Sequence, residues 1–128
     1  MRALLDTHSF IWFVEGDQNL SPAARQSITD PANEILLSAA SLWEIAIKVS
    51  IGKLSLTQPF QTSVLGQMAY NDIRLLDISV AHILEVLTLP FHHRDPFDRM
   101  IIAQASAERI PVIGIDRIFD AYGIQRLW

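Results

Sequence analysis

The chain has 128 residues, half of them apolar and 19% charged, which indicates one globular domain over 1–128 and excludes a disordered chain. The absence of cysteine excludes disulfide bonds, thiolate metal sites and a cysteine nucleophile. The net charge of −4 excludes a protein that simply coats nucleic acid, but not an enzyme that reaches phosphate through bound cations.

The N-terminal segment is typical neither of a signal peptide nor of a membrane anchor, because an acid stands at position 6 and no long apolar run follows. We therefore expect a cytoplasmic protein with no membrane contact. The apolar run 2–5 predicts a strand that ends at Asp6, and helical character follows over 8–16. Ser21 as N-cap and Pro22 as the first helical residue predict the start of a second helix.

The middle of the chain continues this alternation. A second strand is predicted over 34–38, followed by a helix from 39 that ends at Gly52. Pro59 begins a further helix over roughly 60–70. A third strand is predicted over 73–79.

The C-terminal part predicts two more helices and two more strands. Ser79 is a suitable N-cap for a helix over 80–87, and another helix begins near Phe97. The remaining predicted strands are 111–115, followed by Asp116, and 124–128. Short apolar strands that alternate with helices indicate an α/β fold, with a parallel sheet covered by helices on both faces.

Four acids are expected at one edge of this sheet. Asp6 and Asp116 directly follow strands, and Glu44 and Asp98 lie in the first turns of helices. Ligands of open parallel sheets bind outside the carboxyl ends of the strands, so the four side chains could converge there. Their mutual repulsion would be relieved by Mg²⁺ or Mn²⁺, which prefer oxygen ligands. This arrangement suits metal-dependent phosphodiester hydrolysis.

Each acid also has a purely structural interpretation. Asp95 and Asp98 stand at a helix start and could cap it, and Asp116 could cap the last helix. Asp6 could form an Asx-turn, and Glu44 could be a solvated residue on a helix face. Only their common placement favours a site over these alternatives.

Four segments of the chain, in order along nearly its whole length, resemble the PIN-domain family. They are "LLDTHSFIW", "LSAASLWEIAIK", "HRDPFDRMIIAQA" and "VIGIDRIFDAYGIQRLW". More narrowly, they are similar to the VapC-type toxins of bacterial type II toxin–antitoxin systems. This resemblance implies a three-layer α/β/α sandwich with a short central parallel sheet, and a ribonuclease that depends on Mg²⁺ or Mn²⁺. It also implies an RNA substrate, a cognate antitoxin protein and a homodimer.

The family's four acids match Asp6, Glu44, Asp98 and Asp116, which the resemblance makes both metal ligands and catalytic residues. The family often has a small or hydroxyl residue before the fourth acid. Here Gly114 and Ile115 precede Asp116, so a hydroxyl that sometimes supports the metal is missing.

Further polar residues flank the acids. Asp95, from the "DPFDR" sequence, could take part in catalysis, cap the helix or bind Arg94 or Arg99. Thr7 could orient a water at the metal or act as a helix N-cap, and Ser41 lies one turn before Glu44. Arginines beside the acids are candidate phosphate contacts, or else solvated and ion-paired side chains: Arg94, Arg99 and Arg117.

The histidines do not favour a zinc site. His8, His92 and His93 lack the close spacing that zinc ligands usually show, and we expect His92 and His93 in an exposed loop near RNA.

Three other functions are alternatives to the ribonuclease. The apolar helices near 39–51 and 60–70 could be a partner surface, so a catalytically silent PIN-like binding module is the main alternative. A phosphatase or a receiver domain is disfavoured, because a receiver has paired acids after the first strand and a lysine after the last one, which this chain lacks. DNA nucleases of related fold are usually much longer chains.

Overall fold

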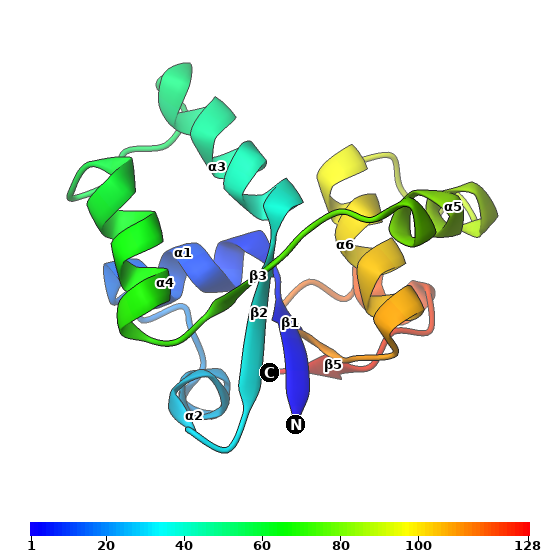
Figure 1. The fold of residues 1–128 in the computed structure, drawn as a ribbon, viewed down its shortest axis with the longest axis horizontal. Helices are drawn as coiled ribbons and strands as arrows, with labels where there is room; N and C mark the ends of the chain where they lie inside the picture. Colours follow the sequence, from blue (N-terminus) through cyan, green and yellow to red (C-terminus); the bar gives the residue numbers. More distant parts are fainter.

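The computed structural model describes residues 1–128 and consists of a parallel sheet between two layers of helices (Figure 1). Its five strands have the order β3-β2-β1-β4-β5. The strands are β1 (Arg2–Leu5), β2 (Glu34–Ser38), β3 (Arg74–Leu76), β4 (Val112–Ile113) and β5 (Arg126–Leu127). The α/β sandwich predicted from the sequence is confirmed.

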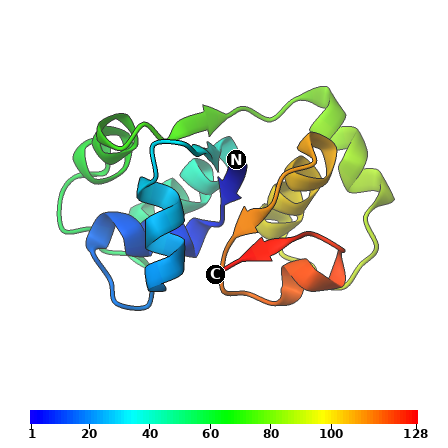
Figure 2. The ribbon, with the colours of Figure 1, turned by 90° about the horizontal axis from the view of Figure 1, so that it is seen from below.

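The helices fall into two groups on opposite faces of the sheet (Figure 2). One face is covered by α1 (Thr7–Glu15), α2 (Pro22–Thr29), α3 (Ala39–Ser50), the π-helix η1 (Gln61–Gly66) and α4 (Gln67–Tyr70). The other face is covered by α6 (Pro96–Glu108) and α7 (Ile118–Ala121), and α5 (Val80–Thr88) packs against α6. No helix of the chain is both long enough and apolar enough to cross a membrane.

Alternate residues of the central strands enter two separate cores. Ala3 and Leu5 of β1 pack in the first helical layer, whereas Leu4 packs against Ile101 and Ile102 of α6. Successive side chains of a strand point to opposite faces, and both faces are covered here. Apart from polar residues at their ends, the strands are therefore apolar, as the sequence predicted.

Three strands are shorter than predicted, because the segments 73–79, 111–115 and 124–128 each contain a strand of only two or three residues. Pro111 has no N–H to donate, but its carbonyl accepts from Leu4 N at 3.0 Å. Gly114 N likewise donates to Leu127 O at 3.1 Å beyond the end of β4. The pairing thus extends past the regular strands.

The helix starts follow the predicted caps. Ser21 accepts a hydrogen bond from Ala24 N, and Ser79 accepts one from His82 N. The predicted helix over 60–70 differs from the structure, in which η1 precedes the single turn α4. The Ser63 hydroxyl donates to Gln58 O at 3.0 Å, five residues back, which accompanies the wider π turn.

Candidate active site

Asp6 is the first residue after β1 and the N-cap of α1. Its Oδ1 accepts from Ser9 N at 2.7 Å, so the helix start fixes the carboxylate in place. The side chain is almost fully buried, and this burial raises the pKa of Asp6 above its usual value. The hydrogen bond from Ser9 and the charge of His8 act in the opposite direction without cancelling the effect. The predicted Asx-type role of Asp6 is thus real, and the cap is Asp6 rather than Thr7.

Gly114 lies directly against the other oxygen of this carboxylate. A Cβ atom at Gly114 would be 2.6 Å from Asp6 Oδ2 and 2.9 Å from its Cγ, closer than real Cβ contacts. Position 114 therefore has no room for a side chain. Gly114, one of the two residues that stand where the family sometimes has a hydroxyl side chain, thus leaves space for the Asp6 carboxylate.

Glu44 projects from the second turn of α3 and is 5% exposed. Its Oε2 forms an ion pair with Lys48 Nζ at 2.8 Å, one turn further along the helix. Its Oε1 is buried and has no hydrogen-bond partner. A buried carboxylate oxygen without a partner is costly, which points to a ligand that the protein itself does not supply. The alternative of a solvated Glu44 is wrong.

Asp98 lies in the first turn of α6, which begins at the N-cap Asp95. Burial of the Asp98 carboxyl group raises its pKa from 3.8 to about 7. The smaller causes are the negative charges of neighbouring acids, in falling order Asp95, Glu44, Asp6 and Asp116. Glu44, Asp6 and Asp116 thus lie near enough to Asp98 to raise its pKa, which is consistent with a common edge of the sheet.

Asp116 and Asp95 complete the set of acids. Asp116 is exposed beyond the end of β4, and its Oδ1 accepts from Ile118 N at 2.9 Å at the start of α7. Asp95 Oδ1 accepts from Phe97 N at 2.9 Å and from Asp98 N at 3.0 Å. The capping interpretation of Asp95 is confirmed, whereas the N-cap of α7 is Arg117 and Asp116 forms a turn just before it. Asp95 forms no ion pair with Arg94 or Arg99.

These carboxylates fit a magnesium-type ion better than a metal held entirely by protein. No group of three or more histidine or acidic side chains is arranged to hold an ion by itself. Mg²⁺ usually keeps several waters and binds one or two carboxylates plus substrate phosphate. The unpartnered Glu44 Oε1 and the raised pKa of Asp98 agree with such a site.

Thr7 and Ser41 form a buried link between α1 and α3. The Thr7 hydroxyl donates to Ser41 Oγ at 2.9 Å; Thr7 directly follows Asp6, and Ser41 lies one turn before Glu44. The link holds the start of α1, which carries Asp6, against α3, which carries Glu44. This contact supports a positioning role for both residues.

The three arginines differ in their surroundings. Arg94 and Arg117 are exposed and remain candidate phosphate contacts. Arg99 does not fit that prediction, because it is 6% exposed and its guanidinium already donates to protein groups. The acceptors are Pro90 O at 2.8 Å, Tyr122 Oη at 3.1 Å and Leu89 O at 3.4 Å. Arg99 also lies over the Phe91 ring, 4.1 Å from its centroid.

The sequence analysis did not identify His93 as part of the site. His92 is exposed, as predicted, but the His93 side chain is only 18% exposed, so an exposed position is wrong for it. His93 Nε2 faces Asp98 Oδ2 at 3.6 Å, and Nδ1 lies 2.9 Å from the Tyr122 hydroxyl. Tyr122 is 29 residues away along the chain, so no local motif indicates this contact.

Comparison with known proteins is consistent with this geometry. The family model for the PIN domain matches residues 3–125, nearly the whole chain. The chain belongs to the PIN domain family. The resemblance inferred from the four sequence segments is thereby confirmed.

This PIN domain is 41% identical over 58 residues to Ribonuclease VapC16 of Mycobacterium tuberculosis (strain ATCC 25618 / H37Rv). The match covers 45% of this chain and 41% of that protein, so the chain spans about two fifths of the curated relative it matches.

Three solved structures share the fold over almost the entire chain. VapBC2 from Rickettsia felis, bound to a DNA fragment from its promoter, has a TM-score of 0.76 at 15% identity, covering 99% of this chain and 98% of that one. DNA-bound VapBC from Salmonella typhimurium has a TM-score of 0.73 at 16% identity, covering 99% of this chain and 97% of that one. FitAcB from Neisseria gonorrhoeae has a TM-score of 0.65 at 18% identity, covering 98% of this chain and 96% of that one. At these identities the likeness concerns the fold.

Proposed function

We propose that this PIN domain is a metal-dependent endoribonuclease that acts in the cytoplasm as the toxin of a toxin–antitoxin pair. The observation that carries the proposal is the buried Glu44 Oε1, which has no hydrogen-bond partner and belongs to a set of acids that includes Asp6, Asp98 and Asp116. The relative named Ribonuclease VapC16 and the structures of VapBC complexes support the assignment. Acids gathered at the carboxyl edge of a parallel sheet also lie where such folds bind ligands.

In this proposal Asp6, Glu44, Asp98 and Asp116 hold one or two Mg²⁺ or Mn²⁺ ions. When bound, the cation would neutralise charge on an RNA phosphodiester and activate the attacking water. One carboxylate of the set would orient that water and accept its proton. Attack on phosphorus breaks the bond to the 3′ oxygen, which takes a proton, and leaves 5′-phosphate and 3′-hydroxyl ends.

The metal requirement is tested by incubating a mixed RNA pool with the protein in Mg²⁺ or Mn²⁺. We expect cleavage that disappears with EDTA and returns with excess cation. Asp30→Asn is a matched control that should cleave normally, because Asp30 lies between α2 and β2, at the amino edge of the sheet.

Calorimetry with Mn²⁺ separates the outcomes of that experiment. Cleavage that persists in EDTA would overturn the metal dependence. Metal binding without cleavage of the pool would indicate a narrow RNA specificity, and an RNA library of wider sequence range would then have to be cut. Neither binding nor cleavage would favour the silent binding module.

An antitoxin partner is part of the proposal and rests on the resemblance to VapC-type toxins. The fold neighbours are VapBC complexes, which supports a protein partner. An antitoxin that covers the acids would block RNA access, and a cationic segment would complement their charge.

We propose further that the chain forms a homodimer through the face of α5. Helix α5 exposes Val80, Ile83, Leu84 and Leu87, with exposed fractions of 51–80%. Their spacing places them on one stripe of the helix. Monomeric proteins rarely expose apolar patches of this kind, and a two-fold dimer would bury the same patch on both copies.

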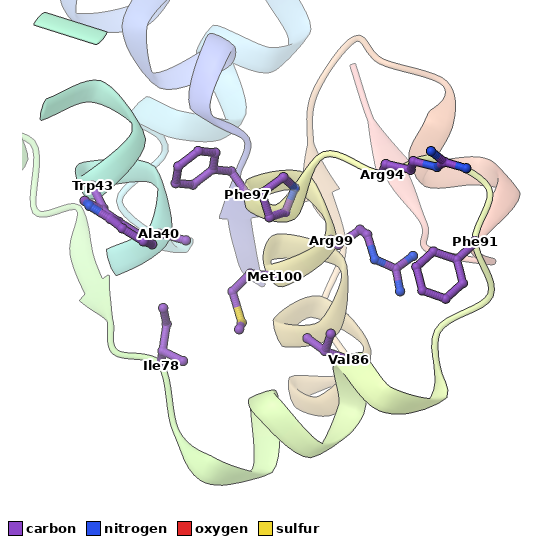
Figure 3. Close-up of a pocket in the computed structure, with 10 residues that line it drawn as sticks. Ala40, Trp43, Ile78, Val86, Phe91, Arg94, Phe97, Arg99 and Met100 are labelled. Atoms are coloured by element: carbon purple, nitrogen blue, oxygen red, sulfur yellow. The ribbon is translucent and has the colours of Figure 1, made fainter. Parts of the chain in front are cut away.

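An apolar groove of about 400 Å³ lies between α3, α5 and the start of α6, and α5 contributes Val86 to it (Figure 3). Its apolar lining includes Trp43, Ile78, Val86, Phe91, Phe97 and Met100. Trp43 and Phe97 meet edge to face, with ring centroids 5.4 Å apart. Each directly precedes a site acid, Glu44 or Asp98, so a second copy seated here would border the RNA site.

Leu84→Glu should weaken the dimer by roughly 30-fold or more, the loss typical of a central interface residue. Light scattering after gel filtration over a range of concentrations measures this change. Leu65→Glu is the matched control, because Leu65 is 45% exposed on η1, in the opposite helical layer. A wild-type chain that stays monomeric, or a dimer weakened equally by both variants, would contradict this interface.

A further inference from the structure

Behind Asp98 lies a tyrosine–histidine pair that the proposed chemistry does not yet use. His93 belongs to the loop between α5 and α6, and Tyr122 directly follows α7. His93 Nε2 is buried and has no hydrogen-bond partner, and its nearest acid oxygen is Asp98 Oδ2 at 3.6 Å. The pair therefore connects the segment after α7 to Asp98.

Contacts of the Tyr122 hydroxyl define where its hydrogen points. Its oxygen accepts three N–H groups: His92 N at 3.2 Å, His93 N at 3.3 Å and Arg99 Nη1 at 3.1 Å. A phenolic oxygen has only two lone pairs, which these three N–H groups already share, so it cannot also accept from the His93 ring. The hydroxyl hydrogen is then directed to His93 Nδ1, at 2.9 Å. The guanidinium of Arg99 strengthens this donor by polarising the hydroxyl group.

This arrangement assigns the tautomer of the histidine ring. Because Nδ1 accepts from Tyr122, the neutral ring carries its hydrogen on Nε2. That hydrogen faces Asp98 Oδ2. The separation of 3.6 Å is slightly longer than a hydrogen bond, as is common in sites without substrate, where such contacts shorten on binding.

Arg99 holds the loop that carries His93. It donates to the carbonyls of Leu89 and Pro90 and packs on the ring of Phe91, all within the four residues before His93. The burial of Arg99 thus has a purpose other than phosphate binding, because it fixes the loop and the hydroxyl together.

We propose that His93 is a positioning residue whose Nε2–H, oriented by Tyr122, holds the Asp98 carboxylate for the divalent cation and the phosphodiester. This inference rests on the metal-dependent function proposed above. Carboxylates that bind metals are usually held by such outer hydrogen bonds, and their loss typically lowers metal affinity by 10–100-fold. Neither His93 nor Tyr122 needs to touch the ion.

Two variants of His93 separate its two ring nitrogens. His93→Asn keeps a polar atom near the Nδ1 position but removes the group that faces Asp98, whereas His93→Gln keeps a donor near Nε2. By calorimetry, we expect Mn²⁺ affinity to fall about 10–100-fold in His93→Asn and to remain within a few-fold of wild type in His93→Gln. Equal affinities of His93→Asn and wild type would overturn the inference and leave the proposed function standing.

A spectroscopic measurement tests the contact without metal. Nitrogen–proton correlation spectra of the imidazole rings should show His93 with its hydrogen on Nε2 and Nδ1 as acceptor. The Nε2 signal should shift in Asp98→Asn and stay unchanged in Asp30→Asn. A hydrogen on Nδ1 would overturn the inference whatever the chain does with RNA. A wild-type chain that binds no Mn²⁺ would overturn the proposed function and this role of His93 together.

Discussion

Asp98→Asn is expected to lower RNA cleavage by more than about 10³-fold and, at the same time, to stabilise the metal-free protein above pH 7. The loss of cleavage follows from removing a charge that the cation and the water both need. Initial rates at saturating Mn²⁺ measure it, with Asp30→Asn as the control. Unchanged cleavage in Asp98→Asn would remove this residue from the mechanism.

The gain in stability follows from the raised pKa of Asp98. Its folded pKa of about 7 lies above the ordinary 3.8, so the folded state binds a proton more tightly than the unfolded state. The metal-free wild type should therefore lose stability as the pH rises from about 4 to about 7, and the loss should then level off.

Asparagine at position 98 stays uncharged at every pH. The Asp98→Asn variant should therefore be more stable than wild type at pH 8 by on the order of 2 kcal/mol, a figure reduced for partial solvent exposure. Urea unfolding at pH 5 and pH 8 in EDTA measures the difference. Any dependence of stability on pH that remains in the variant should come from Asp6, whose pKa is also raised. A stability gap that does not change with pH would contradict the electrostatic account.

Gly114→Ala is expected to lower cleavage by about 100-fold or more although position 114 carries no functional group. The new Cβ would lie 2.6 Å from Asp6 Oδ2. Asp6 cannot yield freely, because its Oδ1 caps α1 through Ser9 N. Movement of Gly114 would instead strain the hydrogen bond from its N–H to Leu127 O. Overpacking of this kind typically costs about 1–3 kcal/mol of stability.

Gly66→Ala separates the effect of a new contact with Asp6 from the general effect of replacing a glycine by alanine. A Cβ at Gly66 would meet only Gln61 O, at an ordinary 3.5 Å, and this variant should cleave like wild type. Both variants should be compared for RNA cleavage, Mn²⁺ affinity and urea midpoint. Normal metal affinity and cleavage in Gly114→Ala would show that Asp6 does not need this space.

The sequence predicts the layers of this fold well, because parallel strands buried on both faces are apolar at nearly every position. It also predicts that acids after β1 and β4 share an edge with the starts of α3 and α6, since all the strands run parallel. The lengths of β3, β4 and β5 are not predictable in this way, because hydrogen bonds beyond Pro111 and Gly114 depend on neighbouring strands.

The residues around the acids depend on contacts between distant segments. The contact of Gly114 with Asp6, and of Tyr122 with His93, exists only once the sheet and α7 are in place. The burial of Arg99 had a usable signal, because Arg99 precedes the buried Ile102 and Ala103 by three and four positions on one face of α6. Because Arg99 also stands next to the acids Asp95 and Asp98, the sequence favoured a phosphate contact instead.

The two oxygens of Asp6 have different tasks, and this division limits how the protein can change over time. Oδ1 caps α1 through Ser9 N, while Oδ2 lies beside Gly114 on the side of the acids. A descendant that lost its chemistry but kept its fold would still need the cap. Its position 6 should therefore drift to serine, threonine or asparagine, which cap helices without a charge, rather than to an apolar residue. With serine at position 6, position 114 would also gain room for a side chain, because serine lacks the Oδ2 atom that lies against Gly114.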